Sequence, residues 1–263
     1  MATVRVLVIR AAGINCDEEV MYCWRRAGAD PLLVHVNRLV ENPAMLAEVH
    51  IVTIPGGFSY GDDIAAGAIL AQRLALELTD PLRQLVARGG GILGICNGFQ
   101  VLVKMGLLPG GDMGRNAVTV TYNDSARFEA RWTRLAVCTD RCPFLPAPQT
   151  PAPRHIELPI EHAEGRVVTA SDTVCKKLDA AGQVALRYVD ADGRFDTYPA
   201  NPNGSHAGIA GLCDPTGRIF GLMPHPDRYF DRTHHPLWTR GNAQRNPDGL
   251  ELFEHAVRHW QDV

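Results

Sequence analysis

The stretch GILGICNGFQ at residues 91–100 decides the fold. Its apolar first half, Gly91–Ile95, predicts a strand buried on both faces, and the apolar residues after it recur at helical spacing. Between strand and helix lies Gly94-Ile95-Cys96-Asn97-Gly98, a G-x-C-x-G sequence. This pattern is typical of a nucleophile elbow with cysteine in the serine position. The sequence therefore predicts an α/β sheet with a reactive residue at its edge.

Cys96 is the predicted nucleophile. The glycines two residues away on either side allow the strand and the helix to approach closely, and the turn holds the cysteine in a strained conformation with its sulfur directed out of the sheet. The N-terminus of the following helix favours the thiolate form of the side chain. The alternative interpretation is a buried structural cysteine beside two packing glycines.

Three further apolar runs precede this stretch and predict that the sheet is parallel. Val4–Arg10, Leu32–Val36 and His50–Ile54 have the pattern of strands, with helix-like segments between them. The last of these helices is predicted to begin at Asp80-Pro81, with Asp80 as its capping residue. Open α/β sheets bind ligands at the carboxyl ends of their strands. We therefore expect the chemistry in the loops that follow the third run and the elbow strand.

Beyond residue 108 the pattern changes to β-type segments separated by turn residues, at Ala117–Tyr122, Arg127–Cys138, Gln183–Val189 and Arg218–Met223. We expect these segments to form an antiparallel section that extends the parallel sheet. The fold class predicted for the chain is α/β, with an open, mostly parallel sheet flanked by helices and an antiparallel β extension.

Two features indicate the domain organisation. Five prolines between Pro143 and Pro153 predict an extended surface loop at about residues 141–154, because neither a helix nor a central strand tolerates that density. We interpret it as a loop within a single domain covering residues 1–263, since the predicted chemistry needs residues from both sides of it. An amphipathic helix is predicted from about Asp248.

A cysteine that attacks a carbonyl group needs N–H donors for the negative charge that develops on the oxygen. The backbone N–H of Asn97, directly after the nucleophile, is the expected first donor. Pro55-Gly56-Gly57-Phe58 follows a predicted strand, and its glycines let the backbone approach a ligand, so the second donor is assigned to Gly57 or Phe58. The alternative for this segment is a glycine turn before a helix.

The general base is predicted at His225, within Met223-Pro224-His225-Pro226-Asp227. This histidine follows a predicted strand, and the prolines on both sides restrict its backbone. Asp227 lies two residues further on, on the same side of an extended chain, and can accept the imidazole N–H. Cys96, His225 and Asp227 therefore form a triad hypothesis. The alternative is a proline-rich turn with a solvent-exposed histidine.

Composition narrows the classes of function. The 263 residues include 26 Lys and Arg against 29 Asp and Glu, a formal net charge of −3 without a basic run, which argues against nucleic acid as a partner. The sequence has no signal-peptide pattern and no stretch near the roughly 18 apolar residues of a membrane span. Seven cysteines without C-x-x-C spacing fit a reducing, cytoplasmic setting. His255 and His259 are four residues apart but have no third ligand nearby, so no metal site is predicted.

Together these features resemble the class I, triad-type glutamine amidotransferases, and among them the glutaminase subunits of phosphoribosylformylglycinamidine synthase. The nucleophile and histidine motifs are shared across that superfamily. Further segments that carry the resemblance follow one another along most of the chain: Pro55–Asp62 (PGGFSYGD), Arg127–Trp132 (RFEARW), Pro159–Arg166 (PIEHAEGR) and Tyr198–Ser205 (YPANPNGS). Of these, the GGFSYGD, EGR and YPANPNGS runs point to the purine enzymes.

The resemblance implies a flavodoxin-like sheet and a glutaminase mechanism. Cys96 would attack the side-chain amide carbon of glutamine, and His225 would protonate the departing ammonia. Water would then hydrolyse the glutamyl thioester, with His225 as the base. The positions that match substrate-binding residues of the family are Gln100, His162, Gly165 and Arg166.

The resemblance also implies partners. Ammonia would pass to a separate synthetase subunit that uses ATP and magnesium to convert formylglycinamide ribonucleotide to formylglycinamidine ribonucleotide in de novo purine biosynthesis. A small bridging subunit would complete the complex. Because this chain has no recognisable ATP-binding motif, no cofactor is expected in it, and the expected location is the cytoplasm.

One departure from the family pattern concerns the triad. The position of Asp227 is usually glutamate, so its carboxylate falls short by one methylene, about 1.5 Å of reach. Three outcomes are then open: a longer bond to His225, a water bridge, or a backbone shift that restores the contact. Rival interpretations of the chain are an amidotransferase of another pathway, a cysteine hydrolase on the same fold, and a non-catalytic binding module.

Overall fold

Five parallel strands form the centre of the protein. The computed structural model describes residues 3–114, 116–149, 154–240 and 246–262. In spatial order the parallel strands are β2 (Asp30–His35), β1 (Arg5–Arg10), β3 (Ile51–Ile54), β4 (Gly91–Ile95) and β11 (Ile219–Leu222). Every residue of β3, β4 and β11 is buried, as expected for strands that helices cover on both faces.

The sheet continues beyond β11 with antiparallel strands, in the order β10 (Ile209–Cys213), β9 (Val184–Tyr188), β6 (Glu129–Val137) and β7 (His155–His162). β11 is the junction, because it pairs with β4 in parallel and with β10 in antiparallel orientation. The predicted fold class, with its antiparallel extension, is therefore confirmed. Since β4 and β11 are parallel neighbours, the residues that follow them meet at one edge of the sheet.

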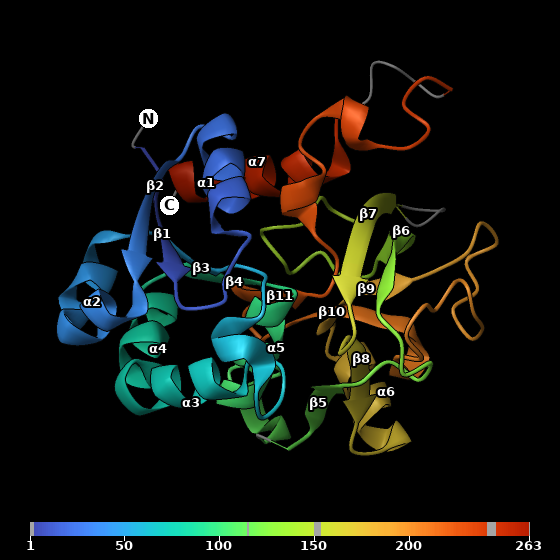
Figure 1. Cartoon of the computed structure of the whole chain (residues 1–263), viewed down its shortest axis with the longest axis horizontal. Helices are drawn as coiled ribbons and strands as arrows, with labels where there is room; N and C mark the ends of the chain where they lie inside the picture. Colours follow the sequence, from blue (N-terminus) through green and yellow to red (C-terminus); the bar gives the residue numbers. More distant parts are fainter. Residues whose placement is uncertain (1–2, 115, 150–153, 241–245, 263) are drawn as a thin grey trace.

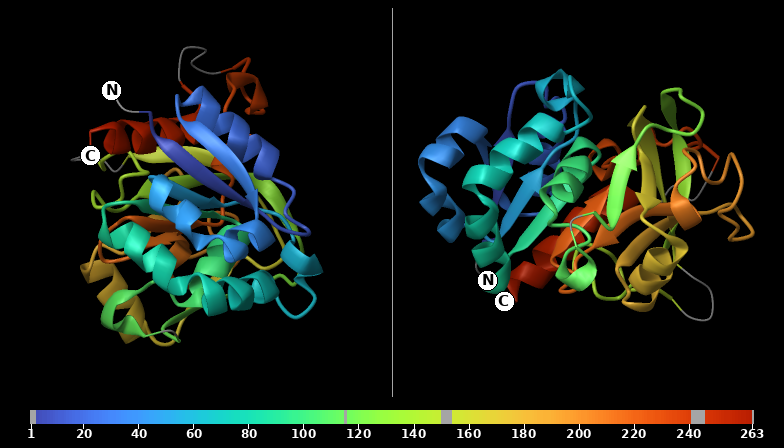
Figure 2. Two further views of the ribbon diagram at one scale, coloured as in Figure 1. Left: turned by 90° about the vertical axis from the view of Figure 1, so that its left-hand side faces the viewer. Right: turned by 90° about the horizontal axis from the view of Figure 1, so that it is seen from below.

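Helices cover both faces of the parallel strands (Figure 1). On one face lie α1 (Asp17–Arg26) and α7 (Asp248–Gln261), and on the other lie α3 (Ala68–Glu77), α4 (Thr79–Ala87) and α5 (Asn97–Met105). The short helix α2 (Val36–Glu41) follows β2. The right-hand view in Figure 2 shows the blue-to-green first half and the yellow-to-orange second half on two sides of the molecule. The red helix α7 returns to the first half, where it packs beside α1.

A second, smaller sheet lies outside the main one. β5 (Val118–Thr121) pairs with β8 (Arg166–Thr169) and packs on α5, and α6 (Asp172–Ala180) follows β8. The predicted strand at residues 117–122 therefore does not extend the main sheet. In the described part of the chain, short 3-10 helices occupy loops at Pro43–Glu48, Ser59–Asp62, Gly111–Met113, His206–Gly208, Pro226–Arg228 and Arg232–His234.

The predicted start of α4 at Asp80 is wrong. The helix begins at Thr79, and Leu78 takes the capping position without a side-chain cap. The cause lies in α3, which leads directly into α4: the N–H of Leu78 donates to Leu74 of α3, and the carbonyl of Leu78 accepts from Leu82 of α4. Asp80 lies in the first turn of α4, where the interaction of its negative charge with the helix dipole still stabilises the helix.

The proline-rich segment is not a surface loop throughout. Cys142, Phe144 and Leu145 are buried, and the ring of Phe144 packs against Phe220 and Trp260 with centroid distances of 5.9 and 5.0 Å. Removing these apolar side chains from water outweighs the extended backbone that the prolines impose. The prediction for residues 150–153 lies outside the described residues.

Gly98→Ala should destabilise the fold by more than about 3 kcal/mol, because overpacked sites have little room to relax. A Cβ atom at position 98 would lie 1.9 Å from the carbonyl oxygen of Ile54, and α5 cannot move away without leaving the sheet. Urea unfolding measures the loss. Gly28→Ala is the matched control, since its Cβ meets no atom within 4 Å and only its φ of +92° costs about 1 kcal/mol. Equal losses in the two variants would contradict the steric explanation.

Candidate active site

Cys96 lies in the sharp turn between β4 and α5. Its backbone has a φ of 51° and a ψ of −105°, a conformation that residues other than glycine rarely adopt. The N–H of Cys96 donates to the carbonyl of Leu222 in β11 at 2.8 Å, so the neighbouring strand holds the turn in place. The sulfur lies 3.9 Å from the carbonyl oxygen of Glu161. The strand, strained turn and helix expected of a nucleophile elbow are all present.

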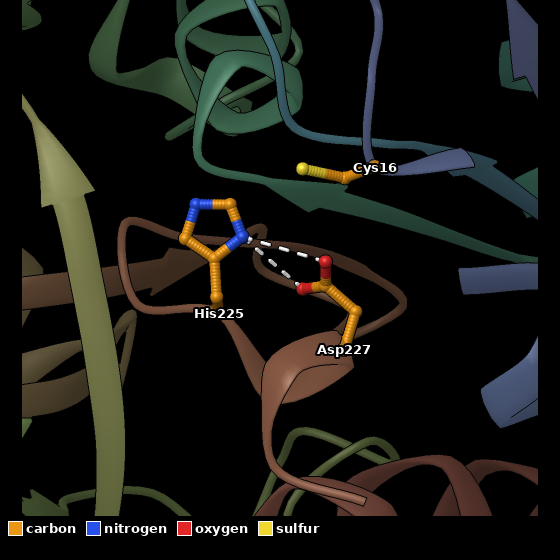
Figure 3. A group of neighbouring side chains, drawn as sticks. All are labelled: Cys16, His225 and Asp227. Atoms are coloured by element: carbon orange, nitrogen blue, oxygen red, sulfur yellow. Dashed lines mark hydrogen bonds and ion pairs between the residues drawn. The ribbon is translucent and has the colours of Figure 1, made fainter. Parts of the chain in front are cut away.

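His225 and Asp227 follow β11, the neighbour of β4. The N–H of His225 donates to Pro159 of β7 at 2.8 Å, which anchors the histidine between two strands. Both side chains are buried, with 2% of His225 and 0% of Asp227 exposed. The Nδ1 atom of His225 lies 3.3 and 3.4 Å from the two carboxylate oxygens of Asp227 (Figure 3). The contact is direct but longer than the 2.7–2.9 Å typical of charge-assisted hydrogen bonds, which is the first of the three outcomes open to the shorter side chain.

Cys96 and His225 converge at Gly56, in the loop after β3. A Cβ atom on Gly56 would lie 2.7 Å from Cε1 of His225 and 3.4 Å from Cβ of Cys96. Any larger residue at this position would therefore clash with the imidazole of His225 and crowd the side chain of Cys96. Cys96 is far in sequence from His225 and Asp227, and the parallel pairing of β4 with β11 brings them to the same edge of the sheet.

The charges of the site act on its two histidines in opposite directions. Burial by itself would lower the pKa of His225, but the carboxylate of Asp227 and the charge of Cys96 outweigh burial and raise that pKa well above its ordinary value. Burial, followed by the charge of His225, lowers the pKa of His162 to about 3. The site therefore holds one histidine that favours the charged form and one that stays neutral at physiological pH.

The loop after β3 contains two predicted oxyanion donors, the backbone N–H groups of Gly57 and Phe58, and one of them is already hydrogen-bonded within the described chain. The N–H of Phe58 donates to Gly13 at 2.8 Å, and the next residue but one, Tyr60, donates to Ala12 at 2.7 Å. Phe58 is therefore not available in this structure, which leaves Gly57 as the candidate in this loop. Asn97 is the first residue of α5, where a helix has N–H groups without acceptors inside the helix.

The turn that links β7 and β8 is built around Asn123. Its side-chain oxygen lies 3.1 Å from Nδ1 of His162 and accepts the N–H of Gly165 at 3.0 Å. The carbonyl of Gly165 accepts from Asn203 at 2.8 Å, and Arg166 donates through Nε to the backbone of the same loop, at position 204. The predicted substrate residues of this turn thus lie together in a rigid, hydrogen-bonded unit.

Gln100 connects this turn to the elbow helix. Its side-chain oxygen accepts from Asn97 at 3.0 Å, and its side-chain nitrogen donates to the carbonyl of Glu164. The Asn97 side chain also accepts the N–H of Ser59 at 3.2 Å and donates to Asp62 at 3.1 Å. Asn97 and Gln100 therefore tie α5 to both loops of the site, a bridging role that the sequence did not predict.

Cys16 is a residue of the site that the sequence prediction missed. It lies in the loop after β1, and its sulfur belongs to a group of three possible metal ligands with His225 and Asp227, whose ligand atoms lie within 4.8 Å of one another. The prediction of no metal site considered only residues close in sequence. Because β1 is also a parallel strand of this sheet, the rule that ligands bind at carboxyl ends could have pointed to its loop as well.

Asp227→Ala should lower kcat for the glutaminase reaction that the resemblance implies by about 10²–10⁴-fold, because the imidazole loses the group that fixes its orientation and tautomer. Asp227→Glu should retain most of the activity, since the long contact to Nδ1 leaves room for a longer side chain. Steady-state glutaminase assays of both variants, in the assembled complex, test this. Unchanged rates in both would show that the carboxylate has no orienting role.

Comparison with known proteins identifies the family of this chain. Residues 3–260 match the family described as the CobB/CobQ-like glutamine amidotransferase domain. The chain is 42% identical to phosphoribosylformylglycinamidine synthase subunit PurQ of Dehalococcoides mccartyi, with 100% of both chains covered. It is 38% identical to the same subunit of Archaeoglobus fulgidus, over 99% of this chain and 98% of the relative.

Solved structures agree with the sequence relatives. In the structure of PurLQS from Thermotoga maritima, a chain with 30% identity superposes with a TM-score of 0.74, over 98% of this chain and 100% of that one. A glutamine amidotransferase from Thermotoga maritima, at 15% identity and a TM-score of 0.54 over 99% of this chain and 98% of that one, shares the fold. From the profile match and the full-length relatives it follows that the chain belongs to the PurQ family of phosphoribosylformylglycinamidine synthase subunits, within the CobB/CobQ-like glutamine amidotransferases.

Proposed function

We propose that this chain hydrolyses L-glutamine to glutamate and ammonia and supplies the ammonia to a synthetase subunit of phosphoribosylformylglycinamidine synthase. The observation that carries the proposal is the convergence of the strained Cys96, the buried His225 and its partner Asp227 over Gly56. Full-length relatives that are named as subunits of this synthase support the choice of pathway.

The first half of the reaction forms a thioester. The sulfur of Cys96 attacks the side-chain amide carbon of glutamine, and the backbone N–H groups of Asn97 and Gly57 stabilise the negative charge on the oxygen. The carbon–nitrogen bond then breaks, and the imidazolium of His225 gives its proton to the departing nitrogen, which leaves as ammonia. The raised pKa of His225 suits this step, because the ring is protonated when the leaving group needs an acid.

The second half releases glutamate. After the transfer His225 is neutral, so it can take a proton from a water molecule that attacks the thioester carbon. The carbon–sulfur bond breaks, and the thiolate of Cys96 and the imidazolium are restored. Asp227 keeps the ring oriented through both halves. His162, Gly165 and Arg166 form the wall of the glutamine pocket, with Gln100 holding it to α5.

The division of labour between the subunits is part of the same proposal. We infer that this chain works with a synthetase partner and with a small bridging subunit. The relative is named as a subunit of the synthase, and the solved relative is part of a PurLQS structure, which supports this inference. ATP and magnesium act on the synthetase partner, and the glutaminase chemistry uses no cofactor in this chain. No helix in the described parts of the chain is both long and apolar enough to cross a bilayer. The cytoplasm is the proposed location.

The acceptor is identified by reconstitution with the synthetase and small subunits of the same organism. Glutamine together with formylglycinamide ribonucleotide and ATP should yield formylglycinamidine ribonucleotide, and other nucleotide or amino-acid acceptors should not be aminated. Amination of a different acceptor would assign the chain to another pathway. Failure of diazo-oxo-norleucine, a glutamine analogue, to label Cys96 in the assembled complex would instead indicate a non-catalytic binding module.

A further inference from the structure

Three possible metal ligands of different types meet beside the nucleophile. The thiol of Cys16, the imidazole of His225 and the carboxylate of Asp227 are all buried, and one ligand atom of each lies within 4.8 Å of the other two. Figure 3 shows the sulfur of Cys16 directed toward the imidazole ring of His225, with the carboxylate of Asp227 beside Nδ1 of that ring. The mechanism of glutamine hydrolysis gives Cys16 no task, so its presence at this point needs a separate explanation.

The separations are close to those of a tetrahedral zinc ion. With the usual zinc bond lengths, tetrahedral geometry places a nitrogen and an oxygen ligand about 3.3 Å apart, and a sulfur and a nitrogen about 3.6 Å apart. Nδ1 of His225 lies 3.3 and 3.4 Å from the oxygens of Asp227, a spacing that is long for a hydrogen bond and right for two zinc ligands. Since its sulfur lies no more than 4.8 Å from either of the other ligand atoms, Cys16 needs at most about 1.2 Å of movement to reach that spacing, which rotation about one side-chain bond supplies.

Cys16 is held in place by the rest of the site. Its backbone N–H donates to Gly56, the glycine over which the thiol of Cys96 and the imidazole meet, at 3.4 Å. The guanidinium of Arg228 donates to the Cys16 sulfur at 3.3 Å and also pairs with Glu161, so the side chain of Cys16 has a contact of its own in addition to that of its backbone. The thiol is therefore ordered beside the imidazole rather than free to turn away from it.

We propose that Cys16, His225 and Asp227 form a binding site for Zn²⁺, and that the bound ion inhibits glutamine hydrolysis. Binding forms bonds from the metal to the Cys16 sulfur, to Nδ1 of His225 and to an Asp227 oxygen, and it releases to solvent the proton of the thiol and the proton on Nδ1. Three protein ligands leave the fourth position of the ion open to water.

The inhibition has a direct cause. With the metal on Nδ1, the remaining proton of the imidazole lies on Nε2, which can no longer accept a proton from the attacking water. Asp227 is also drawn from its contact with the ring to the metal. The inhibition rests on the proposed glutaminase function, whereas metal binding itself does not.

Binding is tested with Co²⁺ as a spectroscopic substitute for zinc in the full-length chain. Thiolate coordination produces a sulfur-to-cobalt charge-transfer band, and four-coordinate cobalt produces intense visible bands. The titration uses Cys96→Ala, so that the nucleophile cannot supply the sulfur. One equivalent of Co²⁺ should develop both bands. Adding Cys16→Ser should abolish the charge-transfer band, and adding Cys138→Ser, at an exposed thiol, should leave it intact.

Alternative outcomes are separated by repeating the titration in chains that keep Cys96. A band that persists there in Cys16→Ser would show that the metal binds the nucleophile instead, and absence of any band in Cys96→Ala would overturn the proposed site. Asp227→Asn in the Cys96→Ala background provides a second ligand variant, which should weaken Co²⁺ binding by about 10-fold or more. Circular dichroism of each variant shows that its fold is retained.

Inhibition is tested by glutaminase assays with Zn²⁺ and with a chelator, each variant being compared with its own metal-free rate. Cys16→Ser should raise the Zn²⁺ concentration needed for half-inhibition by at least about 10-fold, and Cys138→Ser should not change it. Equal inhibition of both variants would overturn the proposal even if hydrolysis occurs as proposed. A chain that binds Co²⁺ through Cys16 but never hydrolyses glutamine would contradict the proposed function and leave the metal site standing.

Discussion

Cys96→Ala is expected to lower the glutamine-dependent rate of the assembled complex by at least about 10⁴-fold, because removal of a nucleophile leaves only binding and oxyanion stabilisation. The rate with ammonia as nitrogen donor should remain, since in the proposed function the synthetase partner carries the ATP-dependent step. The two rates are compared by measuring formylglycinamidine ribonucleotide formed from glutamine and from an ammonium salt.

The control for this prediction is Cys138→Ala. Cys138 is the exposed cysteine, whereas the other six are buried, so its replacement removes a thiol without touching the site. Its glutamine-dependent rate should equal that of the unmodified chain. If Cys96→Ala retained its glutamine-dependent rate, or lost the ammonia-dependent rate to the same extent, the nucleophile assignment would be wrong.

His225→Asn should reduce glutamine hydrolysis by at least about 10³-fold, because the variant loses both the acid for the leaving ammonia and the base for the attacking water. Asparagine keeps a polar group in the buried position but cannot exchange a proton near neutral pH. Trapping of the glutamyl thioester separates the two steps, since the variant should be slow in forming it and slow in hydrolysing it.

The pH dependence of the unmodified enzyme should report the same histidine. Burial opposes the charged ring, but the charges of Asp227 and Cys96 outweigh burial and raise the pKa of His225. The imidazolium therefore persists above the ordinary range, and kcat/KM should fall as the pH rises through this raised pKa. Asp227→Asn removes one of the two charges that raise it. The alkaline limb should therefore move to lower pH in Asp227→Asn, and a limb that stays in place would show that another group controls it.

Local sequence patterns were sufficient to predict many of the helices and strands of the first half of the chain. The run Gly91–Ile95 was predicted with the bounds that the structure gives to β4, and the C-terminal helix begins at Asp248 as predicted. These elements have one dominant signal each: a fully buried strand is continuously apolar, and an amphipathic helix repeats its apolar residues at helical spacing. The elbow was equally clear, because its glycines and cysteine are neighbours in sequence.

Weaker patterns went undetected in the second half. β7 contains Pro159, and its apolar residues are interrupted by charged ones, so it has no clear strand pattern. It forms a strand because it pairs with the nine-residue strand β6. β8 and β10 are short, and α6 was missed although Ser171 caps it by accepting the N–H of Val174. The buried position of Phe144 depends on Phe220 and Trp260, which are distant in sequence.

By itself, the amino-acid sequence determined that the chain forms an α/β sheet with a cysteine elbow, and that His225 with Asp227 could complete a triad, because each of those signals lies within a few neighbouring residues. Only the tertiary structure decided that the N–H of Phe58 donates to Gly13, that Asn123 organises the turn at His162, and that Cys16 lies beside the imidazole of His225. The physical reason is that parallel strands gather their carboxyl ends at one edge of a sheet, so side chains from separate loops become neighbours there without leaving a local pattern in the sequence.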